Sequence, residues 1–229
     1  MKNLLGSLLL FGLCSVFTSC DKDDDTTIAK ANVMVVHASP NAPNVDVRVN
    51  NNVALTNVAY PNNSNYLSVD AGNTNIKVSP TGTMTYVIDG TVNLSANTNY
   101  SVFAVDSVNK IKASVVVDNL TAPAAGKAHI RFLHLAPNAP AVDVALAGGS
   151  VLFGGRTFND QNTNAAVSNF TAVDAGTYNL EVRLANASTV VLPLPGISLQ
   201  AGKIYTVFAK GFVGGNGTQA LGAQIITNN

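Results

Sequence analysis

Several short segments of the chain alternate between apolar and polar residues. Valines alternate with charged residues across 45–49, and a single charged residue separates two apolar ones in 76–78 and again in 180–182. Successive side chains of a β-strand point to opposite faces, so a period of two predicts strands with one face in a core and the charges in water. The run Val115–Val117 lacks this alternation, and it predicts a strand that is buried on both faces.

Turn-forming residues divide these segments at intervals of about eight to twelve residues, as in sandwiches and barrels. No helical period occurs beyond the first 20 residues. The pattern therefore predicts an all-β fold, either a sandwich or a barrel. The turn signals in the first half of the chain stand at 61–64, 70–72, 89–90 and 95–97.

Three sequence patterns occur twice in the same order. The segment 37–47, HASPNAPNVDV, returns at 134–144 as HLAPNAPAVDV. VDAG at 69–72 returns in the second half, and so does the YSVFA pattern at 100–104. A repeat of roughly 100 residues has the commonest domain size, and it predicts two copies of one domain. The second occurrences of the two shorter patterns are 173–176 and 205–209, and the predicted copies cover 31–121 and 127–229.

The N-terminus has the pattern of a bacterial lipoprotein signal peptide over 1–19. A lysine precedes an apolar run of the length of a signal h-region, Leu4–Phe17, which is short for a membrane span. The residues before Cys20 resemble a lipobox, so we expect Cys20 to be lipidated and to anchor the protein to a membrane. Cys14 is the competing site, but bulky Leu13 precedes it. An ordinary secretory peptide that is cleaved near Cys20 is the alternative.

An acidic tether, 20–30, follows the predicted cleavage site. Its DKDDD sequence at 21–25 resembles a signal that sends lipoproteins to the outer face of the outer membrane. We therefore expect a lipid-anchored outer-membrane protein that faces the cell exterior. The alternatives are a periplasm-facing anchor and a charged spacer without export information, because like charges repel and extend a chain.

The composition excludes several classes of protein. Charged residues make up 11% of the chain, formal net charge is zero, and 28 asparagines supply much of the polarity. A nucleic-acid partner is not expected, because such proteins carry a basic surface. Mean hydropathy of +0.22 argues against disorder. Once the signal peptide is removed and Cys20 is acylated, thiol chemistry, disulfides and cysteine metal sites are excluded.

The repeated segments resemble the domain of unknown function 4397 family. Copy one carries VVHASPNAPNVDVRV, YLSVDAG and LSANTNYSVFAVD, and copy two carries FLHLAPNAPAVDVAL, FTAVDAG and LQAGKIYTVFAKG. The resemblance implies an extracytoplasmic all-β protein, with two tandem immunoglobulin-like or transthyretin-like β-sandwich domains after the signal peptide. It implies no agreed activity. Copy two has Leu135-Ala136 where copy one has Ala38-Ser39, so the copies cannot share a role that needs this serine.

A histidine and an aspartate recur in both copies, as His37 with Asp46 and as His134 with Asp143. Such a pair could form part of a catalytic triad or of a metal site. In the structural alternative, which we favour, the histidine caps the Pro-Asn-Ala-Pro turn and the aspartate binds turn amides. We expect no catalytic residues, no metal and no cofactor.

The segment 148–164 is expected to carry the insertion that copy two has relative to copy one. The distance from the histidine to Asp-Ala-Gly is 33 residues in copy one and 40 in copy two. An insertion in one copy of a duplicated scaffold is a natural place for a function of its own. Asp160–Asn164 resembles the start of an EF-hand loop, but Ala165 and Thr171 stand where glycine and glutamate are required. The candidate ligand-binding residues are Phe153, Phe158, Asp160, Asn162 and Asn164. The alternative, which we favour for the ion or polar-ligand site, is a solvated, asparagine-rich loop.

Aromatic residues bear on a glycan partner, because sugar rings stack on aromatic faces. The chain has no tryptophan, and four aromatics recur between the copies and are expected in a core. A strong glycan-binding module is therefore disfavoured, and a weak one stays open. We expect a non-enzymatic surface lipoprotein with a structural, adhesion or binding role, for which a surface glycan or a protein is the candidate partner. The alternative is a glycan- or peptide-binding accessory lipoprotein that uses 148–164. The expected core aromatics are Tyr100, Phe103, Tyr205 and Phe208, and the free candidates are Tyr60, Tyr66, Phe153, Phe158 and Tyr178.

Overall fold

The computed structural model describes residues 28–229, which form two β-rich units of eight strands each. The predicted signal peptide, Cys20 and most of the acidic tether lie outside the described residues. The strands of unit 1 are β1 Lys30–His37, β2 Val45–Val49, β3 Asn52–Val58, β4 Leu67–Asp70, β5 Gly72–Pro80, β6 Ile88–Leu94, β7 Asn99–Val105 and β8 Lys112–Asp118. The strands of unit 2 are β9 Lys127–His134, β10 Val142–Leu146, β11 Val151–Arg156, β12 Thr171–Asp174, β13 Gly176–Leu184, β14 Val190–Leu199, β15 Ile204–Lys210 and β16 Gly222–Thr227.

The two units have the same topology. In unit 1 one sheet has the order β4-β1-β7-β8 and the other β3-β2-β5-β6, and unit 2 repeats these orders as β12-β9-β15-β16 and β11-β10-β13-β14. The central strands β1 and β7 run parallel, as β9 and β15 do, whereas the other pairs are antiparallel. The expectation of an all-β protein with two sandwiches is confirmed.

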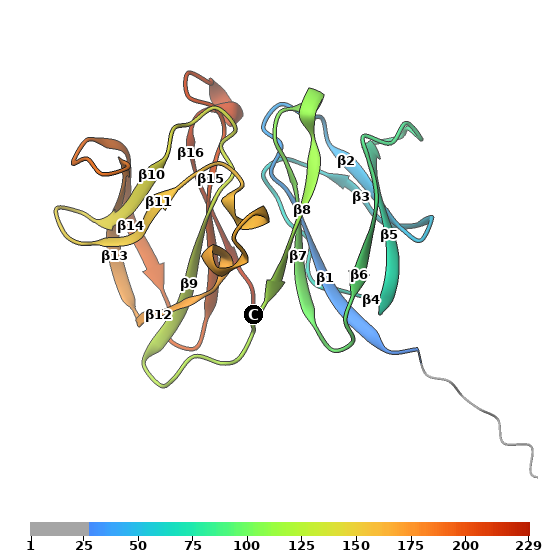
Figure 1. The fold of residues 1–229 in the computed structure, drawn as a ribbon, viewed down its shortest axis with the longest axis horizontal. Helices are drawn as coiled ribbons and strands as arrows, with labels where there is room; N and C mark the ends of the chain where they lie inside the picture. Colours follow the sequence, from blue (N-terminus) through green and yellow to red (C-terminus); the bar gives the residue numbers. More distant parts are fainter. Residues whose placement is uncertain (1–27) are drawn as a thin grey trace, which may run out of the picture.

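The four sheets are stacked as four layers (Figure 1). The sheets that contain β1 and β9 are the two inner layers, and the sheets that contain β2 and β10 are the outer ones. The connection between the units runs along the same end of the molecule at which β1 begins, and the loop after β15 lies at the opposite end. Each inner sheet is therefore covered on both faces.

Each unit has its own apolar core between its two sheets. Val45 and Val47 are 2% and 0% exposed, and Ile76, Val78 and their counterparts Leu180 and Val182 are also buried, as the alternation predicts. The prediction was wrong for Asp46, which was expected on the wet face but is buried. It was also wrong for Val117, which is 57% exposed at the end of the edge strand β8.

The helices within residues 28–229 are four short 3₁₀ turns, and none of them is long and apolar enough to cross a membrane. Two of these turns lie in the connection from β11 to β12, residues 157–170, whose counterpart in unit 1 is the shorter 59–66. The longer connection of unit 2 therefore overlaps the predicted 148–164 at 157–164 and continues beyond it to residue 170. The turns are η1 Val108–Lys110, η2 Asp160–Asn162, η3 Ala165–Ser168 and η4 Gly217–Gln219.

Candidate functional site

A third apolar core, the junction core, joins the two inner sheets. Its members are buried, and they come from β1, β7 and β8 of unit 1 and from β9, β15 and β16 of unit 2, with two residues that directly follow β1 and β9. At about 25 cal/mol for each Å² of apolar surface removed from water, such a core joins the units firmly. The junction core consists of Met34, Val36, Ala38, Phe103, Val105, Val116, Leu133, Leu135, Phe208 and Ile226.

Equivalent strands of the two units meet in this core. Phe103 and Phe208 have equivalent places in the repeat, and their rings contact each other edge to face with centroids 6.1 Å apart. This arrangement resembles a two-fold dimer interface, in which the same patch of each partner meets its copy. The prediction that both phenylalanines lie in a core is confirmed, although this core lies between the units.

A buried ion pair crosses the junction. The guanidinium of Arg131 lies 2.6 Å from the carboxylate of Asp118, and both side chains are 0% exposed. Arg131 also donates to the Thr206 hydroxyl at 2.8 Å, and its guanidinium lies 4.4 Å from the centre of the Phe170 ring. A buried charge is tolerated when it is paired and hydrogen-bonded, and the charge of Arg131 meets both conditions.

Hydrogen bonds around Asp118 extend this polar network. The hydroxyls of Tyr66 and Ser101 each donate to the second carboxylate oxygen at 2.6 Å. The side-chain amide of Asn228 donates to the Tyr66 oxygen at 3.1 Å and accepts from Thr206 at 2.8 Å. Burial and the neighbouring negative charge raise the pKa of Tyr66, so its hydroxyl stays protonated and keeps donating.

The connection 157–170 docks unit 2 onto unit 1. The Ser114 hydroxyl of β8 donates to the Asn162 side chain at 2.7 Å and accepts from the Gln161 amide at 2.9 Å. Gln161 is 4% exposed, and its amide also donates to Asn159 at 2.8 Å. The residues that are specific to unit 2 therefore contribute to the contact between the units. This role could not be predicted from the sequence, because Gln161 has no feature there that distinguishes it from other polar loop residues.

The five predicted ligand-binding residues do not meet at one place. Phe153 stacks on Phe132, with ring centroids 6.3 Å apart, and Lys112 of unit 1 lies 5.6 Å from the centre of the Phe158 ring. Asp160 receives two hydrogen bonds of 2.8 Å from Arg156. Asn162 binds Ser114, and Asn164 accepts from the Ala166 amide at 3.2 Å. All five have internal contacts.

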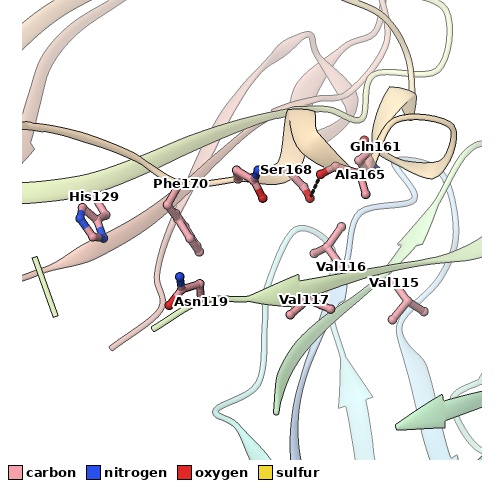
Figure 2. A pocket seen from close by; sticks show the side chains of 10 residues that line it. Val115, Val116, Val117, Asn119, His129, Gln161, Ala165, Ser168 and Phe170 are labelled. Carbon is pink, nitrogen blue, oxygen red and sulfur yellow. Dashed lines mark hydrogen bonds between the residues drawn. The ribbon is translucent and has the colours of Figure 1, made fainter. Parts of the chain in front are cut away.

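A cleft of about 510 Å³, the junction cleft, opens between β8 and this connection (Figure 2). Figure 2 shows the valines of β8 on one side, Gln161 and Ala165 across from them, and Asn119, His129 and Phe170 near the end of the strand. Exposed Val117 and half-buried Phe170 give it apolar walls. The cleft is lined by Val115, Val116, Val117, Asn119, His129, Gln161, Ala165, Ser168, Asn169 and Phe170.

Gln161, a lining residue of the junction cleft, has an unused hydrogen-bond acceptor. Its amide nitrogen binds Ser114 and Asn159, whereas its buried Oε1 has no hydrogen-bond partner among residues 28–229. A buried acceptor without a partner costs about 1–3 kcal/mol, so a ligand that donates to it gains that energy. Together with the amides of Asn119 and Asn169, the cleft is suited to a neutral ligand with several hydroxyl or amide groups.

The recurrent histidines and aspartates bind turns, and they do not bind each other. Nε2 of His37 lies 3.0 Å from the Pro43 carbonyl, and Nε2 of His134 lies 3.0 Å from that of Pro140. Asp46 accepts from the amides of Asn57 and Gly82 at 2.9 and 3.0 Å. These amides lower the pKa of the Asp46 carboxyl.

Asp143 has the matching role in unit 2, where it accepts from the amides of Gly155 and Asn186 at 2.6 and 2.9 Å. These contacts are those of the structural alternative. Within residues 28–229 no group of three or more histidine, cysteine, aspartate or glutamate side chains is placed to hold a metal.

The two buried histidines predict a dependence of stability on pH. Burial lowers the pKa of both His37 and His134 below the ordinary value of 6.5, so the unfolded state binds protons that the folded state does not. Their contribution is complete above pH 6.5 and is lost as the pH falls below it. We expect a lower urea midpoint at pH 5 than at pH 7.5, and equal midpoints at pH 7.5 and 8.5. NMR titration of the two imidazoles provides the control, since pKa values at or above 6.5 would contradict this assignment.

The remaining aromatic candidates also have internal contacts. The Tyr60 ring contacts that of His37 edge to face at 5.9 Å, and burial raises the pKa of Tyr60 to about 12. The Tyr178 hydroxyl donates to the Asp174 carbonyl at 2.8 Å. Tyr66 belongs to the Asp118 network. Each of these three side chains is therefore held by at least one contact within the protein.

The fold and the junction define the class of this protein: two β-sandwiches of the same topology are fused through their inner sheets. The family model for the domain of unknown function (DUF4397) matches residues 31–145, which is half of the chain, and the protein belongs to this family. A search of the curated proteins finds no match. Among solved structures the chain is similar to the Bacillus anthracis TIE protein, with 10% identity and a TM-score of 0.26, over 80% of this chain and 34% of that one. The chain thus spans about a third of that protein's length.

Proposed function

We propose that this protein is a non-catalytic surface lipoprotein, anchored through Cys20 in the outer membrane and facing the cell exterior. In this proposal the acidic tether holds the body away from the membrane, and the body acts as a structural, adhesion or binding module. The observation that carries the proposal is the junction, because an apolar core and a buried ion pair unite two sandwiches into one body. A rigid body positions a binding surface at a low cost in entropy.

The anchor is tested by metabolic labelling with radioactive palmitate. The wild-type protein is expected to take up label, and Cys20→Ala is expected to lose it completely because the acylated residue is absent. Cys14→Ala is the matched control and should keep the label. Full labelling of the Cys20→Ala variant would overturn the proposed anchor.

The outward orientation is tested on intact cells with an added protease. Digestion of the protein, while a periplasmic marker stays intact, is the expected outcome. Complete protection would assign the body to the periplasmic face and contradict the exterior location.

A second candidate function is the binding of a glycan or a peptide in the junction cleft. The specific support is the unpaired Oε1 of Gln161, together with the amides and apolar walls around it. This site differs from the one expected from sequence, since only the last part of 148–164 contributes to it. Glycan hydroxyls and peptide amides can both donate to Oε1 and accept from Asn119 or Asn169.

A glycan array and a peptide array, probed with the purified protein, test this candidate. Val117→Trp is expected to weaken binding at least about tenfold, because an indole at this exposed position fills the cleft. Thr227→Trp is the matched control, since Thr227 pairs with Tyr205 as Val117 pairs with Tyr100. Binding that both variants keep equally would exclude the cleft as the site.

A further inference from the structure

Unit 2 contains a second cavity, the unit 2 pocket, which lies between its two sheets and measures about 340 Å³. Its lining comes from the strands β10, β13, β14 and β15 and from the end of β9. The connection from β9 to β10 and the loop after β15 complete it. Three lining residues, Val142, Val182 and Ala209, are members of the unit 2 core, so the pocket is a gap in that core. The lining consists of His134, Ala139, Pro140, Val142, Val182, Leu184, Val191, Leu192, Ala209, Val213 and Leu221.

The walls of the unit 2 pocket are apolar except at His134. A water molecule needs two to four polar partners to remain in a cavity, so a pocket with these walls favours an apolar occupant. The volume of the unit 2 pocket is about twice that of a cavity of roughly 150 Å³ that holds benzene. It also lies at the lower end of the range of small-molecule sites, about 300–1,000 Å³. An occupant of about ten heavy atoms fits this volume.

The chemistry of His134 adds one polar requirement. A carbonyl oxygen only accepts hydrogen bonds, so Nε2 of His134 must carry the proton that it donates to Pro140. Burial lowers the pKa of His134 and keeps the ring neutral, which leaves Nδ1 as an acceptor. Within the described part of the chain, this Nδ1 has no hydrogen-bond partner, although His134 is 0% exposed.

Unit 1 differs at the equivalent histidine. There the Ser39 amide donates to Nδ1 of His37 at 3.4 Å, and the Ser39 hydroxyl donates to the Asp106 carbonyl at 2.6 Å. Unit 2 has Ala136 in place of Ser39, which removes the hydroxyl bond but leaves a backbone amide. Between the two equivalent histidines, the Nδ1 without a partner is that of His134 in unit 2.

The unit 2 pocket also has an entrance. Val191 and Val213 line it and are 37% and 49% exposed, so they form its rim. Val213 belongs to the loop after β15, which lies at the end of the molecule opposite the start of β1 (Figure 1). A ligand can therefore enter from the end that is distant from the proposed membrane anchor.

We propose that the unit 2 pocket binds a small apolar molecule of about ten heavy atoms that carries one hydroxyl group, such as an aromatic or aliphatic alcohol. The apolar part fills the space between the sheets, and the hydroxyl donates to Nδ1 of His134. Ligands with further polar groups are disfavoured, because each buried polar group without a partner costs free energy. This activity is separate from the junction cleft and does not depend on the membrane anchor.

Titration calorimetry with naphthalene and 2-naphthol tests the proposal, because these probes differ only by one hydroxyl. With the purified full-length protein, both are expected to bind in a one-to-one ratio, and 2-naphthol about tenfold more tightly, as one hydrogen bond to a buried acceptor predicts. Absence of saturable binding of either probe would overturn the proposal. Equal affinities would overturn the role of His134.

Val213→Trp is expected to weaken the binding of both probes at least about tenfold by closing the entrance. The matched control is Val108→Trp in unit 1: the Val108 amide donates to the side-chain oxygen of Asn41 at 2.8 Å, as the Val213 amide donates to that of Asn138 at 2.9 Å. An equal loss in both variants, or no loss in Val213→Trp, would contradict the assigned pocket. The ¹⁵N resonance of the unprotonated His134 nitrogen should move upfield with 2-naphthol and stay in place with naphthalene, which tests the contact without any substitution.

Discussion

Replacing Arg131 by methionine is expected to lower the free energy of unfolding by about 3–5 kcal/mol, because it leaves a buried carboxylate without its counter-charge. Asp118 keeps its hydrogen bonds from Tyr66 and Ser101 in this variant, but these do not neutralise the charge. The loss does not come from poor packing. The residue of β1 that is equivalent to Arg131 is Met34, because Met34 pairs with Ser101 as Arg131 pairs with Thr206. Met34 is itself buried in the junction core, so a methionine side chain suits this environment.

Urea unfolding of the variants measures this effect. The double variant Arg131→Met/Asp118→Asn is expected to recover most of the lost stability, because it removes the unpaired charge and keeps an acceptor for both hydroxyls. Lys127→Met is the control: its ion pair with Asp174 is exposed, so a loss below about 1 kcal/mol is expected. If Arg131→Met and Lys127→Met destabilised the protein equally, the buried pair would have no special role at the junction.

The second large effect is expected for Phe208→Ala, at about 3–5 kcal/mol, since a fully buried phenylalanine is removed from a close-packed core. The cavity would lie between the units, against Phe103, and would weaken their coupling as well as their stability. In the wild type, both units should open with a similar free energy, because each inner sheet needs the other to cover it. In the variant, the two free energies should separate.

Hydrogen exchange, followed by mass spectrometry on peptides from each unit, distinguishes this outcome from general destabilisation. Phe153→Ala is the matched control, because Phe153 is half-buried against the unit 2 core and outside the junction. It should destabilise the protein less and leave the two units coupled. Separate opening of the units in Phe153→Ala, but not in Phe208→Ala, would contradict the importance of the junction core.

The strands and the duplication could be predicted from the sequence, because both depend on local patterns. Alternation at 45–49 and 76–78 reports which face of a strand is covered, and the repeated segments report that the fold is built twice. The junction could not be predicted in this way. Apolar runs at 33–36 and 102–105 do indicate burial on both faces, but a run cannot say which surface covers the second face.

The candidate site was harder still to predict, because its residues have ordinary side chains in an unusual place. Gln161 and Asn162 belong to a polar connection, and only the stacking of the sheets brings them to Ser114. Likewise, Asp46 alternates with valines as a solvent-exposed residue would. Its burial follows from two turn amides, one of which lies 36 residues away along the chain.

The near two-fold junction is asymmetric in its fully buried ion pair. Where unit 2 has Arg131, unit 1 has Met34, and where unit 1 has Asp118 at the end of its edge strand, unit 2 has Asn228. Two copies of unit 1 that met in this way would bury two carboxylates without a cation, which is strongly unfavourable. The ion pair therefore selects the pairing of unit 1 with unit 2 over the pairing of like units.

The parallel pairing of β1 with β7 also determines how the body would respond to a pulling force. A pull on the chain at Lys30 would act along β1, whose residues are paired with β7 on one side and with β4 on the other. The hydrogen bonds of both ladders lie across the direction of such a force, so they would be sheared together and could not be broken one at a time. A body tethered at this end and holding a ligand at the opposite one would be built to resist mechanical extraction.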